Sequence, residues 1–120
     1  MSRRAERVGE LLREELSQLL LRRLQDPRLA PLITITEVKV TPDLSQAKVY
    51  FSVMGTEEEK AAAHRALEAA SGYLRRQLGQ VLYLRRTPDL SFHLDESMEK
   101  AAHILAIMNE LARQEGEGSP

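Results

Sequence analysis

The stretch LEAASGYLRRQLG, residues 67–79, has the apolar spacing of a helix but contains two residues that disfavour one. Its apolar side chains recur every three or four positions, as on one face of an α-helix, at Leu67, Ala70, Leu74 and Leu78. Ser71 and Gly72 stand in the middle of this pattern. A glycine inside a helix costs about 1 kcal/mol relative to alanine, and a serine competes for backbone hydrogen bonds. The stretch therefore predicts a helix that is kinked at residues 70–72 and continues as a second helical piece to a C-cap at Gly79.

Two strands are expected before the kinked helix. Residues 32–40 alternate between apolar and polar side chains, with a change of parity at Glu37 that predicts a bulge or a twist. Residues 47–54 are rich in branched and aromatic residues, and the TPDLSQ segment between the two runs has the composition of a turn. The two runs thus predict an antiparallel hairpin. Thr56 followed by Glu59 has the pattern of a capping box, which predicts where the next helix starts.

The sequence TPDLS occurs twice, at residues 41–45 and 87–91. We interpret this as one turn composition used twice rather than an internal duplication. The second copy leads into residues 90–94, whose alternating side chains predict a short third strand.

Long helices are expected at both ends of the chain. The first helix should end before Asp26 and Pro27, because a residue that precedes proline is pushed out of the helical region. From Glu96 onward apolar residues return to helical spacing, and Met98 and Met108 are expected in the core.

The expected order of elements is α-β-β-α(kink)α-β-α. A tight hairpin followed by a long helical crossover predicts an α+β fold, with a mixed three-stranded sheet and helices packed on one face. Residues 1–113 are expected to form this single domain, and residues 114–120 a disordered acidic tail.

Composition excludes several classes of function. The chain has no cysteine, and its three histidines are far apart in sequence, so no metal or cofactor is expected. Neither a secretory signal nor a run of about 20 apolar residues is present, which predicts a cytoplasmic protein without a membrane segment. The serines lie in turns and caps, and Asp43 and Asp89 have the context of turn residues, so an enzyme is not expected.

Charge is distributed unevenly although the net charge is only -1. Residues 61–94 contain five Lys or Arg against two Asp or Glu, whereas residues 95–120 contain two against six. Local potential rather than total charge decides phosphate binding, so a basic surface is compatible with this balance. Taken alone, each arginine pair is more typical of a solvated surface than of a ligand site.

Several blocks of the sequence, from about Arg7 to Leu111, carry a family resemblance. A strand, a helix broken at small residues, a second helix and another strand form the layout of the K-homology (KH) fold, although its usual GxxG is absent here. The Ala70-Ser71-Gly72 segment instead resembles the Ala-x-Gly kink of the bacterial ribosome-binding factor A family, which has the type II KH-like fold. Further blocks that resemble this family, in order, are RVGELLREELSQLL, DPRL, ITEVKVTPDLSQAKVYFSV, AASGYLRRQLG and LRRTPDLSFHLDES.

The resemblance implies a non-enzymatic assembly factor that binds the immature small ribosomal subunit, assists maturation of its rRNA, and supports growth at low temperature. The protein is also expected to be a monomer when it is free. The chain departs from similar proteins at Ala101 and His103, where they often carry glycine and arginine, and in its short acidic C-terminal extension.

RNA contact is expected at the kink, where the N–H groups of a restarted helix would attract a phosphate. The candidate RNA-binding residues are Arg3, Arg4, Arg7, Arg22, Arg23, Arg28, Ala70, Ser71, Gly72, Arg75, Arg76, Arg85 and Arg86. Two alternatives stay open. The kink could serve only to wrap the helix over the sheet, or the domain could dock on a protein through its first helix or a sheet edge without binding RNA.

Overall fold

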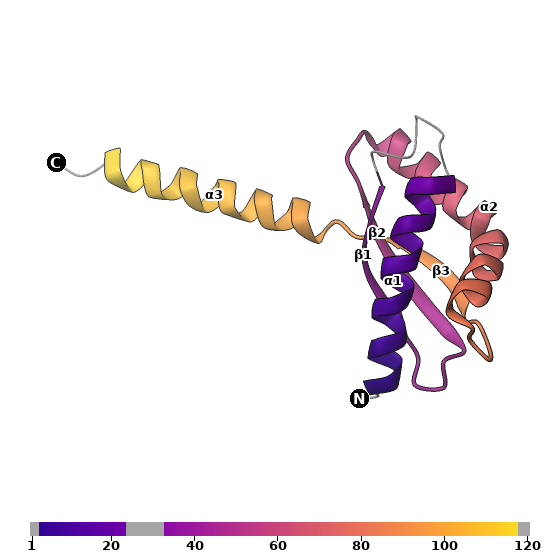
Figure 1. Cartoon of the computed structure of the whole chain (residues 1–120). Helices are drawn as coiled ribbons and strands as arrows, with labels where there is room; N and C mark the ends of the chain where they lie inside the picture. Colours follow the sequence, from indigo (N-terminus) through magenta and orange to yellow (C-terminus); the bar gives the residue numbers. More distant parts are fainter. Residues whose placement is uncertain (1–2, 24–32, 118–120) are drawn as a thin grey trace.

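The computed structural model describes residues 3–23 and 33–117, which form three helices and three strands (Figure 1). In chain order the elements are α1 (Arg3–Arg23), β1 (Ile33–Val40), β2 (Gln46–Val53), α2 (Glu57–Leu82), β3 (Asp89–Leu94) and α3 (Ser97–Glu117).

The sheet has the order β1-β2-β3 and is mixed. β1 and β2 pair antiparallel, and their register shifts between Ile35 and Glu37, which confirms the expected bulge. β2 and β3 pair parallel because the long helix α2 carries the chain back before β3 begins. The predicted α+β, KH-like fold is confirmed.

The core lies between one face of the sheet and the helices α1 and α2. Alternate residues of β2 point into it, so Ala47, Val49, Phe51 and Val53 are all buried. Leucines of the two helices pack on these residues, including the fully buried Leu12, Leu16, Leu67, Leu74 and Leu78.

The helix α2 is bent but not interrupted. Its capping box at Thr56 and Glu59 is present as predicted, and Figure 1 shows the helix changing direction partway along its length. The expected break at Ala70-Ser71-Gly72 is wrong, since the helix continues through these residues to Leu82. Apolar residues on both sides of the bend, such as Leu67 and Leu74, are buried against the same core, and this packing keeps the helix intact across an unfavourable pair of residues.

Gly79 does not end the helix. The C-cap is Tyr83, in the left-handed region with φ 51° and ψ 38°. Gly79 instead lies where Thr87 packs on α2, and a Cβ added to Gly79 would come within 2.6 Å of Thr87 Oγ1. The glycine is thus used for a close approach of two segments rather than for a turn.

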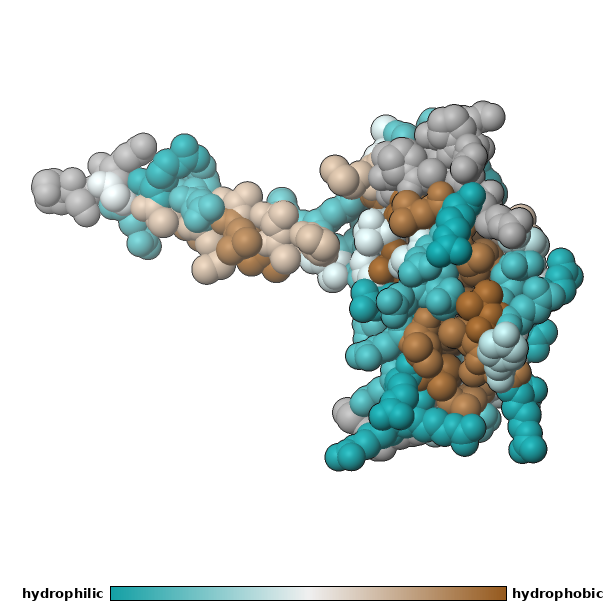
Figure 2. All heavy atoms as spheres, viewed as in Figure 1, coloured by the Kyte–Doolittle hydropathy of each residue, from teal (hydrophilic) through white to brown (hydrophobic). Residues whose placement is uncertain are grey.

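The helix α3 projects away from the rest of the molecule (Figure 1). All of its side chains from Ser97 to Gly116 are exposed, and Figure 2 shows its apolar atoms uncovered. Met98 and Met108 were predicted in the core but are 75% and 58% exposed, because α3 points away from the sheet. The helix extends through Glu117, so residues 114–117 are helical rather than part of a disordered tail. The domain boundary at residue 113 stays a prediction.

Two contacts fix the start of α3. Asp95 accepts a hydrogen bond from the Ser97 backbone N–H at 2.9 Å and another from Thr36 Oγ1 at 2.7 Å. These hydrogen bonds lower the pKa of the Asp95 carboxyl below its usual value. The buried Lys60 forms an ion pair with Glu99 at 2.9 Å.

Candidate nucleic-acid interface

The surface of α2 at Gly72 is open. Gly72 is exposed, and no atom lies within 4 Å of a Cβ added to it. It does not adopt a positive φ either. Neither packing nor backbone conformation in the described part of the chain therefore requires glycine at this position. A glycine on an exposed helix surface leaves room for the backbone of a partner to approach.

The N–H groups at the bend are not available to a phosphate. Because α2 is continuous, residues 70–73 lie in a helix interior, where each N–H is bonded to the carbonyl four residues earlier. The free N–H groups of α2 are at its start, beside the carboxylates of Glu57, Glu58 and Glu59. The expected phosphate site at a restarted helix is thus wrong, and any anion bound near Gly72 must be held by side chains.

The segment between α2 and β3 folds back along α2. The Arg75 guanidinium donates two hydrogen bonds to the Thr87 carbonyl, from Nε at 3.2 Å and from a terminal nitrogen at 3.0 Å. Its Nε also lies 3.4 Å from a carboxylate oxygen of Asp89. Arg75 therefore positions this segment. The sequence predicted instead that Arg75, like Arg76, would be free to bind a phosphate.

The neighbouring arginines are open to solvent. Arg76, Arg85 and Arg86 are all exposed. Within residues 3–23 and 33–117, neither Arg76 nor Arg85 forms an ion pair or a side-chain hydrogen bond. Since Thr87 contacts α2 at Arg75 and Gly79, the segment that contains Arg85 and Arg86 lies at the same end of α2 as Arg76.

The start of α1 lies at the same end of the molecule. Ala5 and Glu6 line a groove together with Val40 and Pro42, which places the first turns of α1 beside the β1–β2 turn. That turn in turn lies beside the α2–β3 segment, because the Asp89 N–H donates to the Ser45 carbonyl at 3.0 Å. Figure 1 shows all three segments at one end of the molecule.

Three exposed arginines of α1 lie at this same end of the molecule: Arg3, Arg4 and Arg7. The first two lie in the first turn of α1, where the helix dipole disfavours a positive charge. Their position is thus unfavourable for the helix itself, as is common at functional sites.

The other candidate arginines lie elsewhere. Arg22 is at the far end of α1, about 30 Å from Arg3 along a helix of this length, and it donates to Gln18 at 2.6 Å. Arg23 ends the same helix. Arg28 lies outside the described residues. We call the set that the structure does bring together the arginine end: Arg3, Arg4, Arg7, Arg76, Arg85 and Arg86.

The β1–β2 turn adds an anion to this end. Asp43 accepts hydrogen bonds from Thr41 Oγ1 at 2.7 Å and from Ser45 Oγ at 2.8 Å. These hydrogen bonds, that from Thr41 most strongly and those from Ser45 next, lower the pKa of Asp43 to about 2. The positive charge of Arg86 makes a smaller contribution in the same direction. Asp43 is therefore a turn residue in the structure, in agreement with its sequence context.

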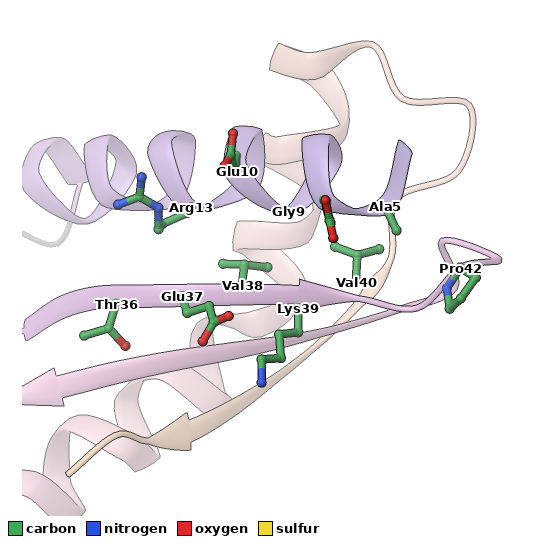
Figure 3. Close-up of a pocket in the computed structure, with 11 residues that line it drawn as sticks. Ala5, Gly9, Glu10, Arg13, Thr36, Glu37, Val38, Lys39, Val40 and Pro42 are labelled. Carbon is green, nitrogen blue, oxygen red and sulfur yellow. The ribbon is translucent and has the colours of Figure 1, made fainter. Parts of the chain in front are cut away.

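A groove of about 630 Å³ runs between α1 and β1 (Figure 3). Its charged lining residues are mixed in sign: Glu6, Glu10, Glu37, Arg13 and Lys39. An excess of carboxylates makes this groove unsuitable for a phosphate chain. It lies along the first helix and the edge of the sheet, where the alternative hypothesis places a protein partner.

Sequence reasoning missed the residues on the sheet face opposite α1 and α2. Tyr50 and His93 lie side by side there, with ring centroids 5.5 Å apart. The alternation of each strand indicates that Tyr50 and His93 both face away from the core. The sequence did not show that they are neighbours, because this depends on the pairing of β2 with β3.

His64 of α2 contacts both β3 and the core. Its Nε2 lies 2.8 Å from the Phe92 carbonyl at the outer edge of β3, and its ring packs edge-on against Phe51. With Glu68, which accepts from the Phe92 N–H at 3.4 Å, it covers part of that edge.

Other kinds of site are not found in the described ranges. Residues 3–23 and 33–117 contain no group of three or more acidic or histidine side chains placed to hold a metal ion. Over the same ranges, no helix has the length and apolarity needed to cross a membrane.

The order of elements and the mixed three-stranded sheet define a KH-like domain. The family model of ribosome-binding factor A matches residues 4–108. A ribosome-binding factor A of Acetivibrio thermocellus is 49% identical over 111 residues, covering 92% of this chain and 90% of that protein. The chain therefore belongs to the ribosome-binding factor A family.

Solved structures agree with this assignment. The crystal structure of ribosome-binding factor A from Thermus thermophilus superposes with a TM-score of 0.64 at 31% identity, covering 75% of this chain and 94% of that one. A homology model of the Thermus thermophilus factor, fitted into the cryo-EM map of a 30S complex, superposes with a TM-score of 0.56 at 32% identity and covers 72% of this chain and 93% of that one.

Proposed function

We propose that this ribosome-binding factor binds the immature small ribosomal subunit, assists the maturation of its rRNA, and leaves when assembly is complete. The protein acts by binding and not as an enzyme, it acts in the cytoplasm, and it is a monomer when it is not bound to the subunit. Family membership and the small-subunit complex of its Thermus relative support this proposal. A role in growth at low temperature belongs to the same proposal.

One observation supports the proposed RNA contact: exposed arginines of α1, α2 and the α2–β3 segment lie at one end of the molecule. Guanidinium groups bind phosphates while staying hydrated in the free protein, and no base-specific geometry is needed for such contacts. We propose that the arginine end holds the rRNA backbone and that the open surface at Gly72 lets this backbone lie close to α2. Ser71, which is half-buried, adds to the same surface by its small size, whereas the predicted contact at Ala70 is not supported because Ala70 packs against the core.

Sedimentation with isolated small subunits tests this function. The protein is expected to sediment with small subunits in preference to large subunits and joined ribosomes. A variant with Arg76→Gln, Arg85→Gln and Arg86→Gln should bind less tightly, and its salt dependence should be shallower by about 0.7 to 0.9 for each phosphate that the variant no longer neutralises. Arg65→Gln is the matched control, since Arg65 is exposed on the same helix about 15 Å nearer its start. Equally weakened binding in the control and the triple variant would contradict the arginine end as the site.

A second candidate function is docking on a protein through the groove between α1 and β1. Its mixed charge and its position along the sheet edge favour a polypeptide over a nucleic acid. Association with small subunits that survives both nuclease treatment and high salt would support this candidate.

A further inference from the structure

The sheet face opposite α1 and α2 carries an aromatic pair on its central strand. Tyr50 is in register with His93 on one side and with Glu37 on the other. The rings of Tyr50 and His93 are 5.5 Å apart and inclined by 34°, and Ser91 Oγ lies 3.0 Å from His93 Nε2 and orients that ring. Both aromatic residues are only half-buried, because α1 and α2 pack on the other face and α3 points away (Figure 1).

Two lysines occupy the adjacent row of this face. Lys39 and Lys48 are directly opposite each other in the antiparallel pair, and both are exposed. Like charges in this position destabilise a sheet. Lys39 Nζ lies 5.5 Å from the centre of the Tyr50 ring, while Lys48 forms no ion pair or hydrogen bond with the part of the chain that is described.

The carboxylates around these lysines are mostly engaged elsewhere. Asp89 is paired with Arg75, and Asp95 accepts from Thr36 and Ser97. Glu37, beside Tyr50, is the remaining acidic side chain on the face. The unfavourable lysine pair is thus left without a nearby anion from β2 or β3, and an anionic ligand would relieve it.

We propose that this face binds unpaired nucleotides of single-stranded RNA, with a base stacked on Tyr50 and His93 and the flanking phosphates beside Lys39 and Lys48. Aromatic rings with neighbouring cations on an open sheet are the combination that holds unstacked bases, and every base presents a ring face to them. The inference rests on the proposed RNA-binding function, but it concerns a surface separate from the arginine end.

Fluorescence anisotropy with labelled ten-nucleotide oligouridine and oligoadenosine tests the proposal, with a ten-base-pair RNA duplex as the comparison. We expect the single strands to bind more tightly than the duplex. Tyr50→Leu, which removes the ring but keeps an apolar side chain in the strand, should weaken binding about tenfold, whereas Tyr50→Phe should retain it. Lys48→Gln should lower the affinity and reduce the salt slope by about 0.7.

Folding is checked separately for each variant. Lys48→Gln removes the like-charge pair, so its unfolding midpoint should not fall below that of the unaltered protein. Lys100→Gln on α3 is the charge control, and Ser52→Ala is the control on the same sheet face; both should bind the single strands normally.

The proposal is overturned if the unaltered protein does not bind the single strands, or if folded Tyr50→Leu and Lys48→Gln variants bind them as it does. Loss of small-subunit binding in the Arg76, Arg85 and Arg86 variant, with oligonucleotide binding independent of Tyr50, would reject this face and leave the proposed function standing. Normal small-subunit binding by that variant, with oligonucleotide binding that depends on Tyr50, would reject the arginine end and support the sheet face.

Discussion

The backbone of α1 lies directly against the backbone of β1 at one point, where Gly9 faces the carbonyl oxygen of Val38. A Cβ added to Gly9 would come within 2.5 Å of that oxygen, well inside van der Waals contact. Figure 3 shows Gly9 on the side of α1 that faces Val38. This contact sets how closely the first helix packs on the sheet.

Gly9→Ala should therefore destabilise the protein. Overpacking typically costs about 1–3 kcal/mol, which exceeds the gain of up to about 1 kcal/mol from replacing glycine in a helix. Urea denaturation should show a lower free energy of unfolding for this variant. Gly116→Ala is the control, because a Cβ at that helical glycine meets nothing within 4 Å. Equal stability of the two variants would show that α1 shifts freely on β1.

Gly72→Ala should have the opposite effect on folding. The added methyl group meets no atom within 4 Å, so the free energy of unfolding should rise by up to about 1 kcal/mol. The same methyl group would hold an RNA backbone away from α2, and several-fold weaker binding to small subunits is expected in sedimentation. A stabilised variant with unchanged binding would remove Gly72 from the site.

Substitutions of the neighbouring residues Arg75 and Arg76 should have different effects, the first on stability and the second on binding. Arg75→Gln loses the two hydrogen bonds to the Thr87 carbonyl and should reduce the free energy of unfolding by about 0.5–1.5 kcal/mol. Arg76→Gln should leave stability unchanged and weaken small-subunit binding. Thermal unfolding measures the stability of both variants, and sedimentation measures their binding. These roles of Arg75 and Arg76 are contradicted if Arg76→Gln is the less stable of the two.

Acid should destabilise the β1–β2 turn within a defined window. Hydrogen bonds from Thr41 and Ser45 lower the pKa of Asp43 from 3.8 to about 2 in the folded protein. A carboxyl with a depressed folded-state pKa contributes stability above its unfolded pKa and loses it as the pH falls through the folded value. Asp43→Asn should therefore make the urea midpoint less dependent on pH between about 4 and 2. Thr41→Ser, which keeps the hydroxyl group, should retain the dependence.

Removal of most of α3 should leave the rest of the protein folded. In a variant that ends at Lys100, the contacts of Asp95 with Ser97 and of Lys60 with Glu99 are kept. The side chains removed between residues 101 and 116 are all exposed, so the free energy of unfolding should change by less than about 0.5 kcal/mol. A large drop in stability would show that α3 packs on the domain in solution.

Local signals in the sequence predicted the elements well. The capping box at Thr56 and Glu59 and the bulge at Glu37 are present, because both depend on residues within one turn or one strand pair. Gly79 was misread as a C-cap because the contact that requires glycine there comes from Thr87, in a segment that packs on α2 only in the folded chain.

The candidate site was predicted in part. The sequence singled out the arginines, but it could not distinguish Arg75, which holds Thr87, from the exposed Arg76. Equally, it could not show that Arg22 lies about 30 Å from Arg3, since that depends on α1 being one uninterrupted helix.

The sequence by itself determined the kind and order of the elements and the family, because these follow from side-chain periodicity, local capping and the order of short sequence blocks, none of which needs a long-range contact. Tertiary structure alone decided that α2 remains whole through Gly72, that α3 stands apart, and that Tyr50 lies beside His93. Each of these depends on burial or strand pairing between residues distant in the chain, where packing outweighs local preferences of about 1 kcal/mol.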